Sequence, residues 1–307
     1  MAGAYAHLTM VNLLRASRRL ENDLKFSSAA SAALLSHLGF CELGAVSPDY
    51  PYLAITDGDA AKWADTMHWT RVGEMLRHGV GVVRDLEGEQ RNKAFAWLLG
   101  YAAHVATDAT IHPVVELKVG AYAANKRAHR VCEMHQDAYV WQRMNLGEIG
   151  LSEHLKSGIA RCAWAGRVDP AVKATWESML RAVHPGAFGR NPPRIDQWHA
   201  AFEKMVDRIG EEGNRLLPLA RHLAVDCGLT YPLAKEIEGE YLQDLRVPGN
   251  RTMSYDQVFA RAMGAVSVVW VAIEAAVFRD DAAALDSIRN WNLDTGRDES
   301  GKLAFWN

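Results

Sequence analysis

The sequence lacks the features that mark secreted, membrane-spanning and disulfide-bonded proteins. Its four cysteines are scattered without a CxxC pair, which favours reduced thiols over a disulfide framework. The N-terminus has no basic segment followed by an apolar core, so we expect no cleaved signal peptide. The most apolar window, 262–273, is flanked by Arg261 and Glu274 and is too short to span a bilayer. These absences predict a cytoplasmic protein without a transmembrane segment, with export by a route that needs no signal peptide left open.

An excess of positive charge is also missing. The 307 residues include 34 Lys and Arg against 37 Asp and Glu, a formal net charge of -3, so no global basic field attracts nucleic acid. The sequence shows no internal repeat, coiled-coil heptad or low-complexity tract, and few windows alternate polar and apolar residues as strands do. The hydrophobic share of 49% suits a globular chain with a sizeable core. We therefore expect an all-α fold and no stable nucleic-acid complex.

Histidine, in contrast, is abundant and unevenly placed. Eight of the twelve histidines precede residue 136, and this bias suggests metal chemistry there, because neutral imidazole is a common metal ligand. The second half shows helical patterns but few ligand types. These patterns cover 152–164, 169–183, 195–224, 232–245 and 255–278, with 185–193 as the best loop candidate. We expect a metal-binding helical core at 1–150 and a helical remainder at 151–307, packed in the same domain.

The strongest pattern is HxxxDxxxHP, formed by His104, Asp108, His112 and Pro113. Residues four apart lie about one turn apart on a helix, so the three ligand types share one face. The helix is expected over 87–111 and is expected to end at the proline. Three good ligands in register form a wall that could hold cations. The alternative is a core histidine with a helix-terminal acid.

A second ligand pattern follows on a helix expected over 124–144. His129 and Glu133 lie four residues apart, with Asp137 one turn further along the same face. His135 points elsewhere if the first two face inward. HxxxE alone is frequent by chance, and it gains weight here because it follows the first pattern so closely.

Two further candidates lie upstream. Asp49 falls in the stretch 44–52 between two prolines, which are expected to fix a loop and end any helix there. Alone, such an acid is more often a turn residue that bonds its own backbone. His68 lies on a helix expected from a turn at 57–59 to about Arg77. Alone, such a histidine is more often a core residue.

Taken together, these candidates supply two neighbouring nitrogen–oxygen sites. One set is Asp49, His68, His104 and Asp108, and the other is His112, His129 and Glu133. Zinc prefers such mixtures, and positions left open for water make a zinc site catalytic. Magnesium would need more carboxylates, and the ExxH motif of di-iron bundles is absent. Two zinc ions can share a hydroxide and clamp both oxygens of a phosphoester displacement.

This order of ligands resembles the bacterial zinc-dependent phospholipase C family, which is related to the S1/P1-type nucleases. The resemblance covers about 5–145 and rests on Ser47-Pro-Asp49-Tyr-Pro, His68-Trp69, Gly-Tyr-x-x-His104-x-x-x-Asp108-x-x-x-His112-Pro and His129-x-x-x-Glu133-x-x-x-Asp137. It is weaker afterwards, where Asn290-Trp-Asn-Leu-Asp-Thr-Gly296 matches a C-terminal signature of uncharacterised members. It implies a single multi-helical domain with a polynuclear zinc cluster at the bottom of a cleft. The implied reaction is hydrolysis of a phospholipid or other phosphodiester, with transient contact to a membrane surface.

Carried over by position, the resemblance assigns the first set of ligands to one zinc and the second set to another. His7 matches the N-terminal histidine of a third site, bridged by Asp108. Secreted members complete that third site with the amino group and carbonyl of a processed N-terminal tryptophan, whereas this chain begins with Met1, six residues before His7. We therefore expect two zinc ions and leave the third open.

The expected mechanism is in-line attack on phosphorus by metal-bound hydroxide. Asp49 is expected both to bind metal and to orient or deprotonate the water, and Asp137 to hold His129 or another ligand imidazole. Three functions stay open: a phospholipase C, a nuclease or nucleotide phosphodiesterase, and a non-catalytic metal-stabilised interaction protein. An exposed apolar rim would favour the first, a base-stacking pocket with Arg or Lys the second, and a closed coordination sphere the third.

Overall fold

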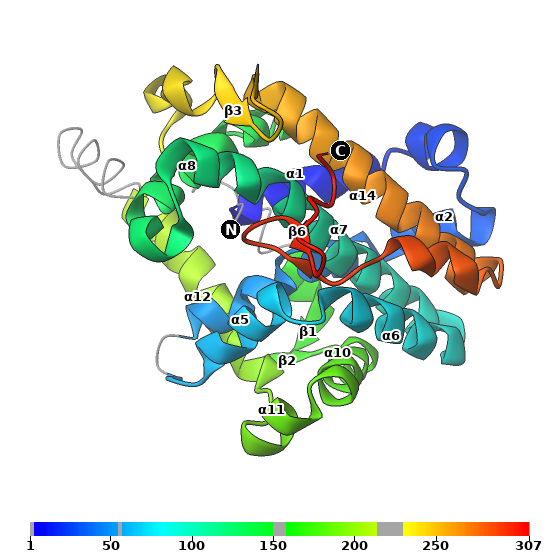
Figure 1. Cartoon of the computed structure of the whole chain (residues 1–307). Helices are drawn as coiled ribbons and strands as arrows, with labels where there is room; N and C mark the ends of the chain where they lie inside the picture. The colour runs from blue at the N-terminus through cyan, green and yellow to red at the C-terminus, as the bar shows by residue number, and fades with distance from the viewer. Residues whose placement is uncertain (1–2, 55–56, 150–157, 214–229, 307) are drawn as a thin grey trace.

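The longest helix, α7 (Gly88–Val119), runs through the middle of the structure, and other helices pack around it (Figure 1). The computed structural model describes residues 3–54, 57–149, 158–213 and 230–306. Within these ranges helices dominate and the strands form only two-stranded antiparallel pairs. The predicted all-α class and single domain are therefore confirmed, with three small hairpins added.

Helix α7 is the axis of the core. Every side chain from Ala94 to Val115 is buried, so this helix has no solvent face over that stretch. Two glycines allow α3 (Leu38–Val46) to cross it closely. A Cβ on Gly100 would lie 1.9 Å from the carbonyl oxygen of Cys41, and one on Gly44 would lie 2.0 Å from that of Trp97. The crossing brings the end of α3 beside the ligand stripe of α7.

The prediction that Pro113 ends this helix is wrong. Helix α7 continues to Val119 with Pro113 inside it. An internal proline leaves the carbonyl four residues earlier without its helical donor and crowds it. That carbonyl belongs to Ala109, and Gly296 packs against it: a Cβ on Gly296 would lie 2.3 Å from the Ala109 oxygen. A distant part of the chain thus covers the break in the hydrogen-bond ladder.

The stretch expected to be a proline loop is also helical. Helix α3 is followed by a 3-10 turn, η2 (Ser47–Asp49), and then by α4 (Tyr50–Leu53). Each proline occupies one of the first two positions of its segment, where a missing N–H costs no hydrogen bond. The prolines therefore redirect the helical path without ending it, and Asp49 lies at the junction.

The single helix expected around His68 is two helices, α5 (Ala60–Trp69) and α6 (Val72–Asp85). They are separated at Arg71, whose φ of 53° is left-handed. The break follows His68 almost directly, so that histidine lies in the last turn of its helix. The helix also continues past its expected end near Arg77, and His78 lies inside α6, where its Nε2 is 3.0 Å from Ser178 Oγ.

The remaining described elements surround these helices. The helices are α1 (Ala4–Leu14), α2 (Ser28–Ser36), α8 (Tyr122–Trp141), α10 (Pro170–Val183), α11 (Pro185–Arg190), α12 (Ile195–Gly213) and α14 (Tyr255–Phe278), with a π-helical segment at Arg19–Asp23 and further 3-10 turns. The hairpins pair β1 (Ala163–Trp164) with β2 (Arg167–Val168), β3 (Leu245–Val247) with β4 (Arg251–Met253), and β5 (Trp291–Asn292) with β6 (Arg297–Asp298).

Predictions for the second half succeed where helices are long. The patterns at 169–183 and 255–278 correspond to α10 and α14. The helix expected over 232–245 is wrong, since short 3-10 turns and β3 occupy it, and the loop expected over 185–193 contains α11. Parts of the patterns at 152–164 and 195–224 lie outside the described residues.

The prediction that the apolar segment around 262–273 is too short to span a bilayer is wrong on length, because this segment belongs to the longer helix α14. Its 24 residues, with a mean hydropathy of 1.6, are long and apolar enough to cross a membrane, and the bent pair of Ser28–Ser36 with Leu38–Leu53 passes the same test. In this structure 61% of the α14 window is buried, and Trp270 donates its indole N–H to the Leu99 carbonyl at 2.8 Å. The helix therefore packs as a core helix, and the absence of a transmembrane segment stays a prediction.

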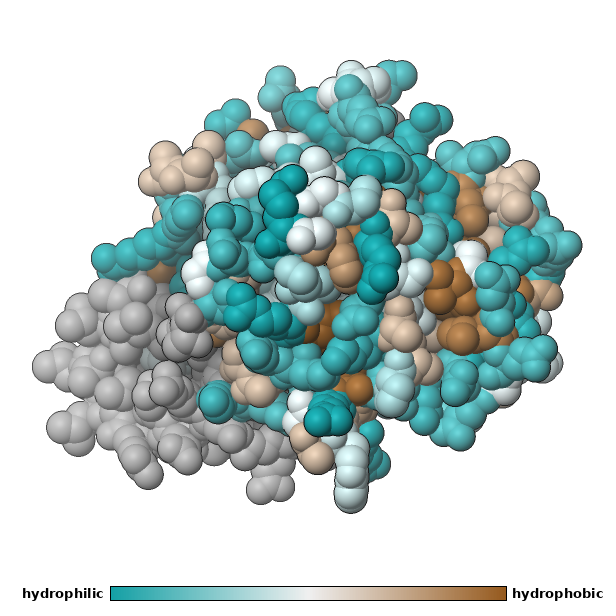
Figure 2. Space-filling view, turned by 90° about the horizontal axis from the view of Figure 1, so that it is seen from below, coloured by the Kyte–Doolittle hydropathy of each residue, from teal (hydrophilic) through white to brown (hydrophobic). Residues whose placement is uncertain are grey.

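One hydrophobic core contains residues from both halves of the chain. Met10 and Trp97 belong to the same cluster as Trp176, Trp270 and Trp306. Seen from below, the surface is mostly hydrophilic, with apolar residues gathered toward one side (Figure 2). The large apolar side chains exposed in the described ranges are Leu35, Trp69, Leu117, Trp164 and Val268.

Candidate metal centre

The carboxylate of Asp108, fully buried in the middle of α7, faces four imidazoles. Its Oδ1 lies 3.2 Å from His7 Nε2 and 3.3 Å from His112 Nε2. Its Oδ2 lies 3.3 Å from His104 Nε2 and 3.7 Å from His68 Nε2. This central acid therefore divides the histidines into two pairs, one at each oxygen.

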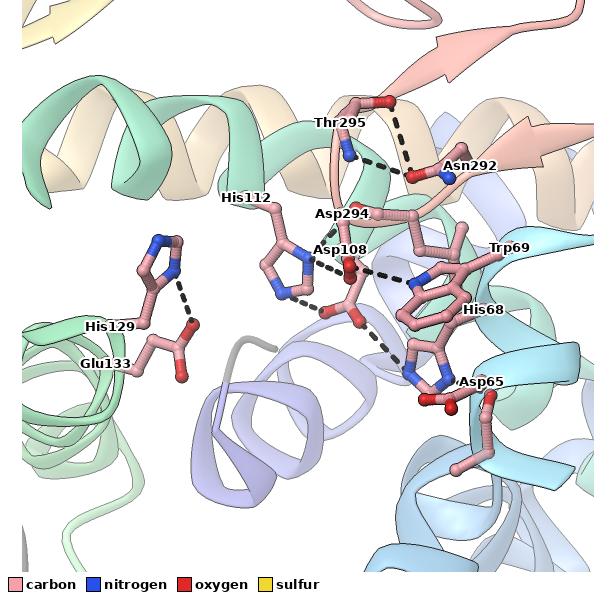
Figure 3. A network of polar contacts seen from close by, with 12 residues as sticks. Asp65, His68, Trp69, Asp108, His112, His129, Glu133, Asn292, Asp294 and Thr295 are labelled. Atoms are coloured by element: carbon pink, nitrogen blue, oxygen red, sulfur yellow. Dashed lines mark hydrogen bonds and ion pairs between the residues drawn. The ribbon is translucent and has the colours of Figure 1, made fainter. Parts of the chain in front are cut away.

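Three helices bring these histidines together. Helix α1 supplies His7, the last turn of α5 supplies His68, and α7 supplies His104 and His112 on the predicted stripe. His68 and His112 point toward Asp108 from opposite sides (Figure 3). Asp49, at the η2–α4 junction, places its Oδ1 3.2 Å from His68 Nε2. The predicted stripe is thus the wall against which the other candidates converge.

Hydrogen bonds to the backbone fix the tautomers of these histidines. Three imidazoles place Nδ1 on a backbone carbonyl oxygen: His68 on Ala64 at 2.8 Å, His104 on Ala45 at 2.9 Å, and His112 on Leu293 at 2.9 Å. A carbonyl oxygen only accepts, so each Nδ1 carries the hydrogen and each Nε2 keeps a free lone pair. All three rings therefore present Nε2 to the centre in the form that binds metal.

The Nε2 atoms of these three histidines are consequently acceptors. His68 Nε2 and His104 Nε2 lie 3.2 Å apart, although each carries a lone pair. Among the residues described, Asp49 Oδ1, His112 Nε2 and both ring nitrogens of His7 are buried with no hydrogen-bond partner. Buried polar atoms are rarely left in this state. A cation between them would be bound by Asp49 Oδ1, His112 Nε2 and one nitrogen of His7, since the other nitrogen of a neutral imidazole carries hydrogen.

The spacing of these acceptors fits zinc. Zinc–ligand bonds of about 2.0–2.1 Å at tetrahedral angles place neighbouring ligand atoms about 3.3 Å apart. The three shortest carboxylate–imidazole distances at Asp108 are 3.2, 3.3 and 3.3 Å. The described residues contain two groups in which all ligand atoms lie within 4.8 Å of one another. One group is His7, His104 and Asp108, and the other is Asp49, His68 and His104. His104 is common to both groups.

Burial and charge keep the ligands ready for a metal. Burial lowers the pKa of the His112 imidazole well below its ordinary value. Burial alone would raise the pKa of the Asp108 carboxyl, but the imidazoles of His112 and His104 hold it well below its usual range. Burial would likewise raise the pKa of Asp49, but the imidazoles of His104 and His68 lower it below its usual value. Neutral imidazoles and ionised carboxylates are the forms that bind metal.

His129 and Glu133 form a separate pair on α8. His129 Nε2–H donates to the Gly120 carbonyl at 2.6 Å, so its Nδ1 is the acceptor that faces Glu133 Oε1 at 3.9 Å. Figure 3 shows this pair set apart from His112. Within the described chain, no group of mutually close ligand atoms joins His112 to both residues. Their common zinc site stays a prediction. Burial raises the pKa of Glu133 to about 8.

The expectation that Asp137 holds a ligand imidazole is wrong. Its carboxylate accepts the backbone N–H groups of Tyr5 at 3.2 Å and Ala6 at 2.9 Å, and the Tyr231 hydroxyl at 3.2 Å. It therefore caps the N-terminus of α1 instead, because the first N–H groups of a helix lack helical partners. Through α1 it fixes the position of His7. Burial raises the pKa of Asp137 to about 7.

Sequence reasoning missed the segment 290–296 as part of the centre. The Leu293 carbonyl accepts from His112 Nδ1, and its N–H donates to the His68 carbonyl at 2.8 Å. Asp294 Oδ2 accepts the Trp69 indole N–H at 2.8 Å, and its Oδ1 lies 4.0 Å from His112 Nδ1 (Figure 3). The motif at 290–296 was the signal that could have located it, but nothing in its spacing linked it to the ligands.

The family described as zinc dependent phospholipase C matches residues 6–186. This stretch contains all eight predicted ligand positions, from His7 to Glu133, and ends before the segment 290–296. No curated protein and no solved structure gives a match.

Proposed function

The chain belongs to the zinc-dependent phospholipase C family, and from this membership we propose that it is a phospholipase C-like hydrolase of phosphodiester bonds. The observation that carries the proposal is the convergence of four histidine imidazoles on the buried carboxylate of Asp108, with Asp49 beside His68. Bound zinc supplies a water of lowered pKa and polarises the phosphoryl oxygen. The protein supplies the positions of the ligands and of the substrate.

Two zinc positions share the central carboxylate in this proposal. Asp49, His68 and His104 hold one together with Asp108 Oδ2, and His7 and His112 hold the other together with Asp108 Oδ1. His129 and Glu133 are proposed to complete the coordination from α8. Each imidazole is assigned to the Asp108 oxygen that it faces, and His104, whose ligand atom is also close to that of His7, lies between the two positions.

Asp49 is proposed to act on the attacking water as well as on metal. Its side chain is 16% exposed, whereas that of Asp108 is fully buried. Of the two acids, Asp49 is therefore the one that solvent reaches. Its lowered pKa keeps it ionised, so it can accept a hydrogen bond from a water placed beside it and align that water with phosphorus.

The proposed substrate is a phospholipid at a membrane surface. Trp69 follows the ligand His68, is 44% exposed, and is held by Asp294. An exposed indole with an anchored N–H suits the boundary between apolar chains and water. The same ring could stack on a base, so a nucleotide phosphodiesterase is the second candidate. The interaction-protein alternative predicts zinc without turnover.

The deciding experiment measures zinc per chain and hydrolysis by the wild type, Asp49→Asn and Asp108→Ala. The substrates are phosphatidylcholine vesicles, a soluble aryl phosphodiester and a dinucleotide. His78→Gln is the matched control, because His78 lies on α6 and contacts Ser178, away from the centre. We expect zinc in the wild type and control, and loss of turnover in both Asp variants.

Different outcomes select different functions. A wild type that is metal-free as purified and indifferent to chelators would overturn the zinc proposal. Dinucleotide cleavage faster than lipid cleavage would favour the nuclease. Retained zinc without hydrolysis of any of the three substrates would favour the interaction protein.

A further inference from the structure

Residues 290–296, called the strap from here on, cross directly behind two of the histidines. We propose that the strap is a structural part of the metal centre, with Leu293 fixing the His112 imidazole and Asp294 acting as a positioning residue for it. The inference rests on the proposed zinc-dependent function. It adds to that function a segment that lies outside the family match at 6–186.

Leu293 links α5 and α7, the two helices that carry His68 and His112. Its carbonyl accepts the Nδ1–H of His112 at 2.9 Å, and its N–H donates to the backbone carbonyl of His68 at 2.8 Å. Leu293 itself is fully buried, so water does not compete for these bonds. The backbone of Leu293 therefore orients the His112 imidazole and also holds the end of α5, which carries His68.

Asp294 places a carboxylate behind the same imidazole. Its Oδ1 lies 4.0 Å from His112 Nδ1, on the side of the ring that faces away from Asp108. Its Oδ2 accepts the indole N–H of Trp69 at 2.8 Å. A negative charge behind a ligand imidazole raises the basicity of the ring, and removing such a partner costs about 10–100-fold in metal affinity.

The strap is held at both ends by contacts that do not involve the centre. At its start, Asn290 accepts from the Glu74 N–H at 3.1 Å and donates to the Glu74 carboxylate at 3.0 Å. At its end, Gly296 has a φ of +64° and rests on α7, where a Cβ would meet the Ala109 oxygen at 2.3 Å. Asn292 accepts from the Thr295 N–H at 3.1 Å and closes the turn between these ends. The strap is therefore fixed independently of any metal.

The experiment compares two strap variants with a matched acid outside the strap. Gly296→Ala pushes the strap away from α7, and Asp294→Asn removes the charge while leaving an oxygen for Trp69. Asp286→Asn is the control, because Asp286 is exposed and precedes the strap. Each full-length protein is assayed for zinc affinity by chelator competition and, after loading with Co(II), for its visible absorption. That spectrum reports the coordination geometry and does not respond to a mere loss of stability.

We expect Asp294→Asn to weaken zinc binding about 10–100-fold, Gly296→Ala to weaken it in the same direction, and both strap variants to alter the cobalt spectrum, with Asp286→Asn like the wild type. If Gly296→Ala fails to fold by circular dichroism, Asp294→Asn decides. Strap variants with wild-type zinc affinity and an unchanged cobalt spectrum would overturn the strap while leaving the proposed function standing. A wild type that binds neither metal would overturn both.

Discussion

Asp137 accepts a hydrogen bond from the backbone N–H of Ala6 at 2.9 Å, and Ala6 is the residue directly before His7. The capping acid on α8 therefore controls a ligand on α1. Gly3 makes room for it, since a Cβ there would lie 2.0 Å from Asp137 Oδ2.

Replacing Asp137 with Ala should remove zinc from the His7 side of the centre. The loss of the cap should cost about 1–2 kcal/mol of stability and free the first turn of α1, so we expect fewer zinc ions per chain by atomic absorption. Asp169→Ala is the matched control, because Asp169 caps α10 by accepting from the Ala171 N–H at 2.9 Å. Equal zinc loss in the two variants would contradict the link to His7.

Asp108→Asn should uncouple thermal stability from zinc. In the wild type, zinc at 100 times its dissociation constant adds about 2.7 kcal/mol to the free energy of unfolding. The amide removes the negative charge and one acceptor from the centre, so the variant should hold less zinc and its melting temperature should not change with chelator. The measurement is thermal unfolding with and without EDTA. A variant that still loses stability to EDTA as the wild type does would count against a bridging role.

Zinc affinity should rise with pH until about pH 8. The raised pKa of Glu133, about 8, means that the metal-free protein holds a proton there at neutral pH. If Glu133 is a ligand, zinc binding must release that proton, so affinity increases as the pH rises toward the pKa and levels off above it. Calorimetry in buffers of different ionisation enthalpy counts the protons released. Glu133→Gln should release fewer, and an unchanged count would exclude Glu133 as a ligand.

His184 should make the metal-free protein sensitive to acid. Burial lowers its pKa to about 4, whereas an unfolded histidine titrates near about 6.5. The unfolded state therefore gains a proton first as the pH falls, and stability is lost between about pH 6.5 and 4. We expect His184→Gln to spare about 1–2 kcal/mol of this loss, less than the full pKa difference implies because His184 is partly exposed. Urea unfolding in EDTA at pH 7 and pH 4.5 tests this, and parallel losses in both proteins would refute it.

Trp69→Ala should slow hydrolysis of vesicles more than hydrolysis of a soluble phosphodiester. The exposed indole is proposed to meet the lipid surface, so its removal should lower the vesicle rate about tenfold, the effect of about 1.4 kcal/mol. Trp164→Ala is the control, because Trp164 is 86% exposed on the β1–β2 hairpin. A similar loss on both substrates would indicate that Trp69 acts on the metal centre through Asp294 and not on lipid.

The ligand stripe of α7 could be predicted because it depends only on helical periodicity. His104, Asp108 and His112 fall one turn apart in any helix, and the helix is buried on every side where they lie. Asp49 and His68 could be placed beside them by resemblance. Which of these side chains meet in space could not be derived from sequence spacing, since the four histidines come from three separate helices.

The features that the sequence did not predict depend on contacts between segments that are distant in the chain. Pro113 reads as a helix end, yet the packing of Gly296 against Ala109 accommodates it. Asp137 reads as a partner for an imidazole, yet it meets the start of α1. Leu293 acts through its backbone, which leaves no trace in residue type. Local propensity is overridden in each case by tertiary packing.

The bond between His112 and Leu293 joins residues 181 positions apart. A ribosome must therefore add 181 residues after His112 before the imidazole can acquire this acceptor. Every predicted ligand precedes Leu293 in the sequence, so all of them are made before the carbonyl that holds the His112 ring. The nascent protein would thus gain the group that orients His112 later than any of the ligands themselves, so the order of synthesis places the assembly of the metal centre after the strap has emerged.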